Sequence, residues 1–175
     1  LLSRGMESTS AHHRIALSVV KLVGGHKPRR LVLGFMVAGA LLSMWISNTA
    51  SILMLMPVAL AVLATCSDRN SLAAPLLLGL AWSCSIGGLG TPIGTPPNLI
   101  LVQVYEANTA QTISFGQWMS WGMPVVLTLL PLAWWWVTRA VPRELDIQVP
   151  AVGPWRSAER RVLVVFGLTA VAWIT

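Results

Sequence analysis

Five polar side chains form a cluster in the first half of the chain, and their types suit a turn that could bind a small cation. They are Ser43, Ser47, Asn48, Thr49 and Ser51, and they lie near the middle of a stretch, residues 31–64, that contains no Asp, Glu, Lys or Arg. Hydroxyl and amide oxygens are ligands that hard cations prefer. Asn caps helices and tolerates left-handed backbone, so we expect Asn48 to lie at a turn between two helices. The last carbonyls of the helix before such a turn carry partial negative charge, which favours Na⁺.

A second candidate site lies at residues 87–98, where four glycines and three prolines occur in twelve residues. This composition cannot continue a helix. The carbonyls left free where the preceding helix stops, up to Gly90, are further candidate Na⁺ ligands. The helix that restarts after Pro97 presents amide groups, which favour an anion. We therefore expect Thr95, Pro97 and Asn98 to line a substrate site.

The side chains in these two segments limit the chemistry that they can perform. Neither segment contains Asp or Glu, so a carboxylate proton relay is not expected. The three histidines all precede both segments, and neither Cys66 nor Cys84 has a His or Cys at metal-ligand spacing. The sequence therefore predicts a protein that is not an enzyme and binds no cofactor, with Na⁺ as a coupling ion.

The elements that position these residues are predicted to be membrane helices. Apolar residues make up 55% of the chain and charged residues 10%, with a mean hydropathy of +0.69, whereas a soluble domain carries about 25% charged residues. Runs without charge cover residues 31–67, 70–105 and 107–138. Runs of this length predict an all-α, multi-pass integral membrane protein, solvated by lipid.

The length of the first run predicts a re-entrant helical hairpin. As one straight helix, residues 31–64 would extend roughly 51 Å, but the hydrocarbon core is about 30 Å thick and two crossings need about 40 residues. Two half-length helices that meet near the midplane fit this length. Irregular backbone at that depth persists only when it is buried in protein or lines a polar cavity. The second run reads as one crossing broken at residues 87–98, and two broken segments in succession are typical of a transporter binding site.

The placement of the charges predicts the topology and excludes nucleic acid as a partner. The net charge is +6, but the basic residues concentrate before the first run and after the third. The connection between the second and third runs contains Glu106 and no Lys or Arg. This alternation follows the positive-inside rule and puts the basic segments in the cytoplasm.

These patterns divide the chain into seven predicted segments. They are the end of a preceding segment plus a cytoplasmic amphipathic interfacial helix (1–30), the re-entrant hairpin (31–66), the broken transmembrane helix (70–105), an external loop (106–117), a transmembrane helix (118–139), a cytoplasmic loop (140–158) and the start of the next transmembrane helix (159–175). Because the last apolar run is shorter than a spanning helix, we expect the chain to be a fragment cut within that helix.

The two candidate segments together resemble those of a known transporter family. Ser47-Asn48-Thr49 in a re-entrant hairpin, followed by SIGGLGTPIGTPPN at residues 85–98, is similar to the divalent anion/sodium symporters, which carry dicarboxylates, citrate and sulfate. The resemblance extends over nearly the whole chain. It implies a fold of two inverted repeats, of which this chain is most of the first, and a homodimer in the inner membrane. It also implies that Ser43, Ser47, Asn48 and the Gly94 carbonyl hold one Na⁺, while Asn48 and Thr49 contact a substrate carboxylate.

The function that these observations favour is Na⁺-coupled transport of a small divalent anion, a C4-dicarboxylate before sulfate. A Na⁺-independent dicarboxylate or anion exchanger of the same fold remains an alternative. A broken-helix ion channel or a Na⁺/H⁺ antiporter is another, although an antiporter should have an intramembrane Asp. A purely structural membrane subunit would leave both polar interruptions unexplained.

Overall fold

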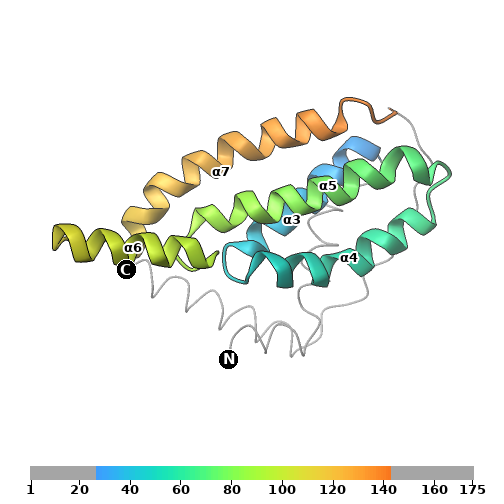
Figure 1. Cartoon of the computed structure of the whole chain (residues 1–175). Helices are drawn as coiled ribbons and strands as arrows, with labels where there is room; N and C mark the ends of the chain where they lie inside the picture. The colour runs from blue at the N-terminus through green and yellow to red at the C-terminus, as the bar shows by residue number, and fades with distance from the viewer. Residues whose placement is uncertain (1–26, 143–175) are drawn as a thin grey trace, which may run out of the picture.

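A computed structural model describes residues 27–142 of the chain, and every regular element within this range is a helix. In chain order they are α3 (Pro28–Ser43), α4 (Asn48–Ala64), α5 (Arg69–Gly87), the short 3-10 helix η1 (Gly88–Gly90), α6 (Pro96–Thr109) and α7 (Phe115–Thr138) (Figure 1). The interfacial helix expected before residue 27, and the loop and helix expected beyond residue 142, lie outside the described residues.

Local sequence signals explain where these helices begin. Pro28 and Pro96 open α3 and α6 in the first turn, where the missing amide hydrogen has no intrahelical partner to lose. Ser47, Asp68 and Ser114 precede α4, α5 and α7, and each side-chain oxygen accepts a hydrogen bond from the amide three residues later, at 3.4, 3.3 and 3.2 Å respectively. The described helix starts are therefore encoded by single capping residues or prolines.

The helix ends differ in places from the segment boundaries expected from charge. The helix α6 continues to Thr109 and ends at Ala110, which adopts a left-handed conformation with φ of 55°. Glu106 thus lies inside α6 rather than in a loop, because nothing in its neighbourhood breaks the helix. The helix α7 begins at Phe115, three residues before the expected start, because the Ser114 cap comes earlier than the apolar run suggests.

The helices form an elongated bundle in which α3 and α4 make a helical hairpin (Figure 1). The start of α3, the end of α4, the start of α5 and the end of α7 all lie at one end of the bundle. The hairpin turn lies partway along the bundle, next to the place where α5 ends. The helix α6 projects beyond the hairpin turn, and Asn98 is its one buried residue. The hairpin turn and the end of α5 are thus the centre of the arrangement.

Small residues allow α3 and α5 to pack closely. Gly79, Ser83 and Gly87 recur at every fourth position of α5 and face α3, a pattern typical of close helix pairs in membranes. A Cβ atom on Gly87 would lie only 2.3 Å from the Ala40 carbonyl oxygen. At the other end of the stripe, Gly79 faces the Met36 side chain. This contact line brings the end of α3 against the end of α5. The hydrophobic core around it contains Leu31, Phe35, Leu55, Val62, Leu72, Leu76 and Leu80.

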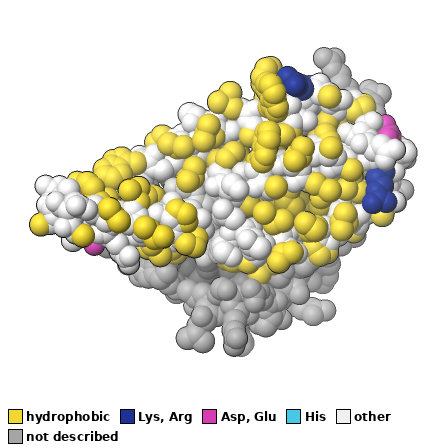
Figure 2. Space-filling view, in the orientation of Figure 1, with side chains coloured by type: hydrophobic (Ala, Val, Ile, Leu, Met, Phe, Trp, Pro, Cys, Tyr) yellow, Lys and Arg dark blue, Asp and Glu magenta, His cyan; other side chains and the backbone are white. Residues whose placement is uncertain are grey.

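Two of the described helices are long and apolar enough to cross a membrane, by length and composition. They cover Arg69–Gly90 and Phe115–Thr138, and Asn48–Ala64 is a shorter apolar helix. Lys and Arg side chains are visible at the end of the bundle where α7 finishes, and an acidic side chain is visible on α6 at the other end (Figure 2). Between these charged ends, many large apolar side chains of α6 and α7 are exposed.

Candidate functional site

The turn between α3 and α4 carries the first group of candidate residues. Ser43 is the last residue of α3 and is fully buried, and Asn48 is the first residue of α4. The Ser43 hydroxyl donates to Asn48 Oδ1 across the turn at 2.5 Å. The Ser47 hydroxyl accepts from the Ala50 amide and so caps α4. Two of the three expected side-chain Na⁺ ligands, Ser43 and Asn48, are therefore in direct contact.

The break between α5 and α6 is held together by Asn98. Its amide nitrogen donates to the carbonyl oxygens of Gly88 at 2.8 Å and of Thr91 at 2.9 Å. The Thr91 carbonyl also accepts from the Gly94 amide at 3.3 Å. A Cβ on Gly94 would lie 2.5 Å from the Gly88 carbonyl oxygen, so the backbone folds back on itself at a distance that only glycine permits.

The two interruptions meet at the centre of the bundle. The Thr91 hydroxyl donates to the Met44 carbonyl oxygen in the hairpin turn. The Asn48 amide lies directly against Gly88, where an added Cβ would be 2.5 Å from Oδ1. Gly90 packs against the Met44 side chain. The contacts therefore join residues about forty positions apart in sequence into one polar cluster, which we call the crossing.

The crossing contains some of the expected site residues and leaves others at its edge. Ser43, Asn48, Gly90 and Gly94 lie within it through the contacts above. Expected site residues that are exposed or half-buried beside it are Ser47, Thr49, Thr95 and Pro97. Side chains at such an edge are accessible to a solute, whereas Ser43 is covered by protein. All of the expected cation ligands except Ser47 therefore lie within the crossing, and most of the expected substrate contacts lie at its edge.

Asn98 has a different environment from the one expected of a substrate contact. It is 5% exposed, and both donor positions of its amide are used by carbonyls within the break. Only its Oδ1 atom is left to contact another group. We therefore describe Asn98 as a clamp that fixes the shape of the break.

The amide groups expected to attract an anion are unequally distributed between α4 and α6. Pro96 and Pro97 have no amide hydrogen, and the Asn98 amide donates to the Thr95 carbonyl at 3.1 Å. In α4, the first intrahelical bond runs from the Ser51 amide to the Ser47 carbonyl, so the amides of Asn48 and Thr49 precede it. The start of α4 is therefore the better anion site of the two.

Two residues at or near the crossing were not assigned to the site from sequence: Thr91, and Ser51, which belongs to the polar cluster of the first run. The Thr91 side chain connects the break to the hairpin turn. Its position within the glycine-proline segment could have indicated that it belongs to the site. Ser51 is fully buried, and within residues 27–142 its hydroxyl has no hydrogen-bond partner. It lies one helical turn after Asn48, so the spacing of the polar residues on α4 could have indicated it.

The donor atoms of the crossing are neutral oxygens. Within residues 27–142 there is no group of three or more His, Cys, Asp or Glu that could hold a metal ion. Hydroxyl, amide and carbonyl oxygens are suited to a hard monovalent or divalent cation rather than to a metal that prefers nitrogen or sulfur. The residues present therefore fit Na⁺.

The whole chain is similar to known transport proteins. A citrate transporter family matches residues 1–175. The sodium-dependent dicarboxylate transporter SdcS of Staphylococcus saprophyticus is 33% identical over 196 residues, which cover 100% of this chain and 38% of that protein. SdcS of Staphylococcus aureus (strain NCTC 8325 / PS 47) is 32% identical with the same coverage. The chain thus spans less than two-fifths of the length of these relatives.

These matches confirm the resemblance to anion symporters that the two sequence segments indicated. The matched family and relatives are transporters and not enzymes. Because the family match extends from the first residue to the last, the chain belongs to the citrate transporter family.

Proposed function

We propose that the protein carries small divalent anions, C4-dicarboxylates first among them, across the inner membrane together with Na⁺. The observation that carries this proposal is the position of the Asn48 amide, which contacts Ser43 on one side and Gly88 on the other. One side chain thus links both helix interruptions, with no charged residue in either. The names of the two staphylococcal relatives, sodium-dependent dicarboxylate transporters, support the same substrate class and coupling ion.

In this proposal the hairpin of α3 and α4 is re-entrant. The helices α5, η1 and α6 together form one interrupted transmembrane segment. The separation of basic side chains at one end from Glu106 near the other supports a cytoplasmic position for the basic end (Figure 2). The crossing then lies between the two charged ends, where transporters with discontinuous helices bind their substrates. By the family resemblance, the chain contributes one of two inverted repeats, and the protein works as a homodimer.

The proposed cation site is built around two oxygens that are in contact, Ser43 Oγ and Asn48 Oδ1. Ser43 Oγ and Asn48 Oδ1 supply two ligands, Ser47 a third, and the carbonyls of Gly90 and Gly94 complete the set. A Na⁺ that takes both Ser43 Oγ and Asn48 Oδ1 replaces the 2.5 Å hydrogen bond between them. The substrate carboxylate then binds at the start of α4, against the amides of Asn48 and Thr49.

Adjacent binding explains how Na⁺ and the anion are coupled. Two opposite unit charges about 4 Å apart interact by about 4 kcal/mol at an effective dielectric constant of about 20. Residues 31–67 and 70–105 contain no charged side chain that could replace either ion. Because linkage is reciprocal, Na⁺ raises the affinity for the anion by the same factor by which the anion raises the affinity for Na⁺.

Uptake into liposomes tests the proposal. The full-length protein is reconstituted in liposomes. Uptake of radiolabelled succinate and sulfate is then followed with an inward Na⁺ gradient or an equal choline gradient. We expect succinate to accumulate only with Na⁺. Uptake that does not depend on Na⁺ and requires an anion inside the liposomes would show that the protein is a Na⁺-independent exchanger instead. The absence of anion uptake under any gradient would contradict transport of divalent anions.

The variant Asn48→Ala tests the position of the site. It removes Oδ1, so we expect the affinities for Na⁺ and for succinate each to fall on the order of tenfold or more, because a hydrogen bond to a charged group contributes about 1.5–3 kcal/mol. Asn108→Ala is the matched control, since Asn108 is exposed near the end of α6 and bonds only the Val104 carbonyl. Normal transport by Asn48→Ala would show that the site lies elsewhere.

The variant Asn48→Asp separates the two roles of this residue. A carboxylate still accepts the Ser43 hydrogen bond and attracts Na⁺, but it repels a substrate carboxylate. We therefore expect Na⁺ to stabilise the purified variant against heat as it does the unmodified protein, while the succinate concentration for half-maximal uptake rises. Loss of the Na⁺-dependent stabilisation with normal succinate affinity would reverse the proposed roles.

A further inference from the structure

An open groove between α5 and α7 is lined by large apolar side chains. It has a volume of about 410 Å³, and its lining includes Trp82 and Ile86 from α5 and Leu132, Trp135 and Trp136 from α7. Trp82, Trp135 and Trp136 remain 42%, 60% and 50% exposed. Within residues 27–142, these three side chains are therefore only partly covered.

One end of the groove is basic. The guanidinium of Arg139 lies 3.8 Å from the centre of the Trp136 ring, so the cation stacks directly on a wall of the groove. Figure 2 shows a basic side chain beside a column of hydrophobic side chains at this end of the bundle. The charge thus lies at the end of the groove, where the apolar wall stops.

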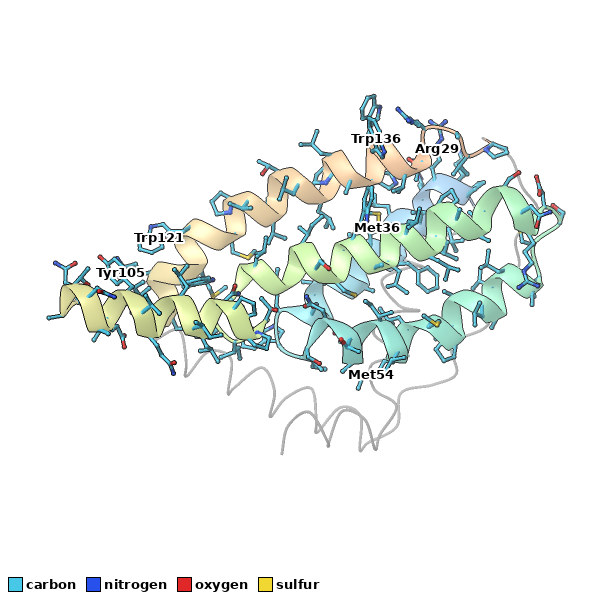
Figure 3. All side chains as sticks on the ribbon, in the orientation of Figure 1. Arg29, Met36, Met54, Tyr105, Trp121 and Trp136 are labelled. Atoms are coloured by element: carbon cyan, nitrogen blue, oxygen red, sulfur yellow. The ribbon has the colours of Figure 1, made fainter. Side chains whose placement is uncertain are left out.

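The start of α3 adds further positive charge to the same corner. The Arg29 guanidinium donates to the carbonyls of Arg139 and Val141, and Trp134 donates to the Arg29 carbonyl at 2.8 Å. Figure 3 shows Arg29 beside Trp136. These bonds tie the first turn of α3 to the last turn of α7, so the exposed side chains of Lys27 and Arg30 lie in that region.

No carboxylate within residues 27–142 neutralises this corner. The acidic residues in that range are Asp68 and Glu106. Asp68 accepts hydrogen bonds from the Ser71 hydroxyl and amide, and Glu106 belongs to α6, at the opposite end of the bundle. Within residues 27–142, no carboxylate is therefore paired with the Arg139 guanidinium.

We propose that this groove binds an anionic glycerophospholipid, with an acyl chain along the tryptophans and the headgroup phosphate on Arg139. The groove matches an apolar chain because its lining is apolar, and its basic end matches a negative headgroup. Tryptophans at the membrane interface and basic pockets between membrane helices are known to serve these two functions.

A second apolar groove shows why the charge matters. It has a volume of about 330 Å³ between η1, α6 and α7, and Leu101, Tyr105, Trp118 and Trp121 line it. Tyr105 and Trp121 lie close together in Figure 3. No basic residue lies in α6 or in α7 before its end, and the charged residue next to Tyr105 is Glu106. This groove therefore has no feature that selects an anionic lipid.

Native mass spectrometry of the purified protein in detergent measures the lipid preference. The probes are phosphatidylglycerol and phosphatidylcholine with identical palmitoyl and oleoyl chains. We expect tighter binding of phosphatidylglycerol, and a loss of about fivefold in this preference in Arg139→Gln, the factor that corresponds to about 1 kcal/mol for one basic residue at an anionic surface. Arg69→Gln is the matched control, because Arg69 is exposed at the same end of the bundle but outside the groove.

Brominated lipids locate the binding. In liposomes, phosphatidylglycerol with brominated chains should quench tryptophan fluorescence more than brominated phosphatidylcholine at the same mole fraction, and Trp136→Phe should reduce the difference. Equal binding of both lipids would overturn the proposal, as would an unchanged preference in Arg139→Gln. Phosphatidylglycerol binding that Trp136→Phe and Arg139→Gln both leave intact would mean that the lipid binds elsewhere on the protein, and would also overturn the proposal.

Discussion

Replacing Gly88 by alanine tests whether the break after α5 positions the Asn48 amide. A Cβ on Gly88 would lie 2.5 Å from Asn48 Oδ1 and 3.4 Å from its Cγ and Nδ2 atoms. Real Cβ atoms do not approach other heavy atoms closer than 3.0 Å. The amide oxygen must therefore retreat by at least about 0.5 Å to remove the overlap.

The retreat has a cost that the structure allows us to work out. Asn48 Oδ1 accepts from the Ser43 hydroxyl at 2.5 Å, and Ser43 is fully buried. A retreat of about 0.5 Å lengthens this hydrogen bond to at most about 3.0 Å, so it breaks only if the amide group turns away from Ser43. A buried hydroxyl then loses its partner, at about 1–3 kcal/mol. One proposed cation ligand is displaced as well. We expect the Na⁺ concentration for half-maximal succinate uptake to rise on the order of tenfold, which corresponds to about 1.4 kcal/mol.

Two glycines of α5, Gly79 and Gly87, serve as comparisons for Gly88. Gly79→Ala should leave the Na⁺ dependence unchanged, because its Cβ would meet the flexible Met36 thioether at 3.1 Å. Gly87→Ala should lower thermal stability and yield, because its Cβ would overlap the Ala40 backbone at 2.3 Å. A Gly88→Ala protein that folds and keeps the normal Na⁺ dependence would refute the link between this break and cation binding.

Three further predictions concern stability. Asn98→Ala should lower the thermal unfolding midpoint in detergent, because two buried carbonyls lose their donor at about 1–3 kcal/mol each; an unchanged midpoint would show that Asn98 is not a clamp. Ser51→Ala should raise the midpoint measured without Na⁺, because it removes a buried hydroxyl that has no partner within residues 27–142; a lower midpoint would mean that this hydroxyl is satisfied in solution. Hydrogen bonds from the Ser71 hydroxyl and then from the Ser71 amide lower the pKa of Asp68 below its ordinary value of 3.8. The ionised Asp68 cap therefore stabilises α5 fully above pH 3.8, and this stabilisation is lost as the pH falls through the lower pKa of the folded protein. Hydrogen-exchange protection at the start of α5 should follow this pH dependence, and Asp68→Asn should abolish it.

Several features of this protein could be predicted from composition and local sequence. The charge-free runs indicate membrane helices because charged side chains are costly in hydrocarbon. The glycines and prolines of residues 87–98 indicate a break because they cannot continue a helix. The same short segments indicated the family resemblance, which a match over residues 1–175 confirms. These properties depend on single residues and their neighbours in the chain.

The helix boundaries were less predictable. Charge and hydropathy suggested an external loop from residue 106, but α6 continues to Thr109 and ends at a left-handed Ala110. The start of α7 depends on one hydroxyl, that of Ser114, rather than on the beginning of the apolar run. Hydropathy averages over many residues and therefore cannot locate a boundary that a single hydrogen bond determines.

The sequence by itself determined that the chain contains two polar interruptions between apolar helices, with Asn48 in the first and Asn98 in the second. Only the tertiary structure decided that they meet, because their contact depends on the close packing of α3 against the small residues of α5. It also decided that Asn48 lies between both interruptions while the Asn98 amide holds the second one together. Both side chains have the same donors and acceptors, and their surroundings, which no local pattern specifies, assign them different roles.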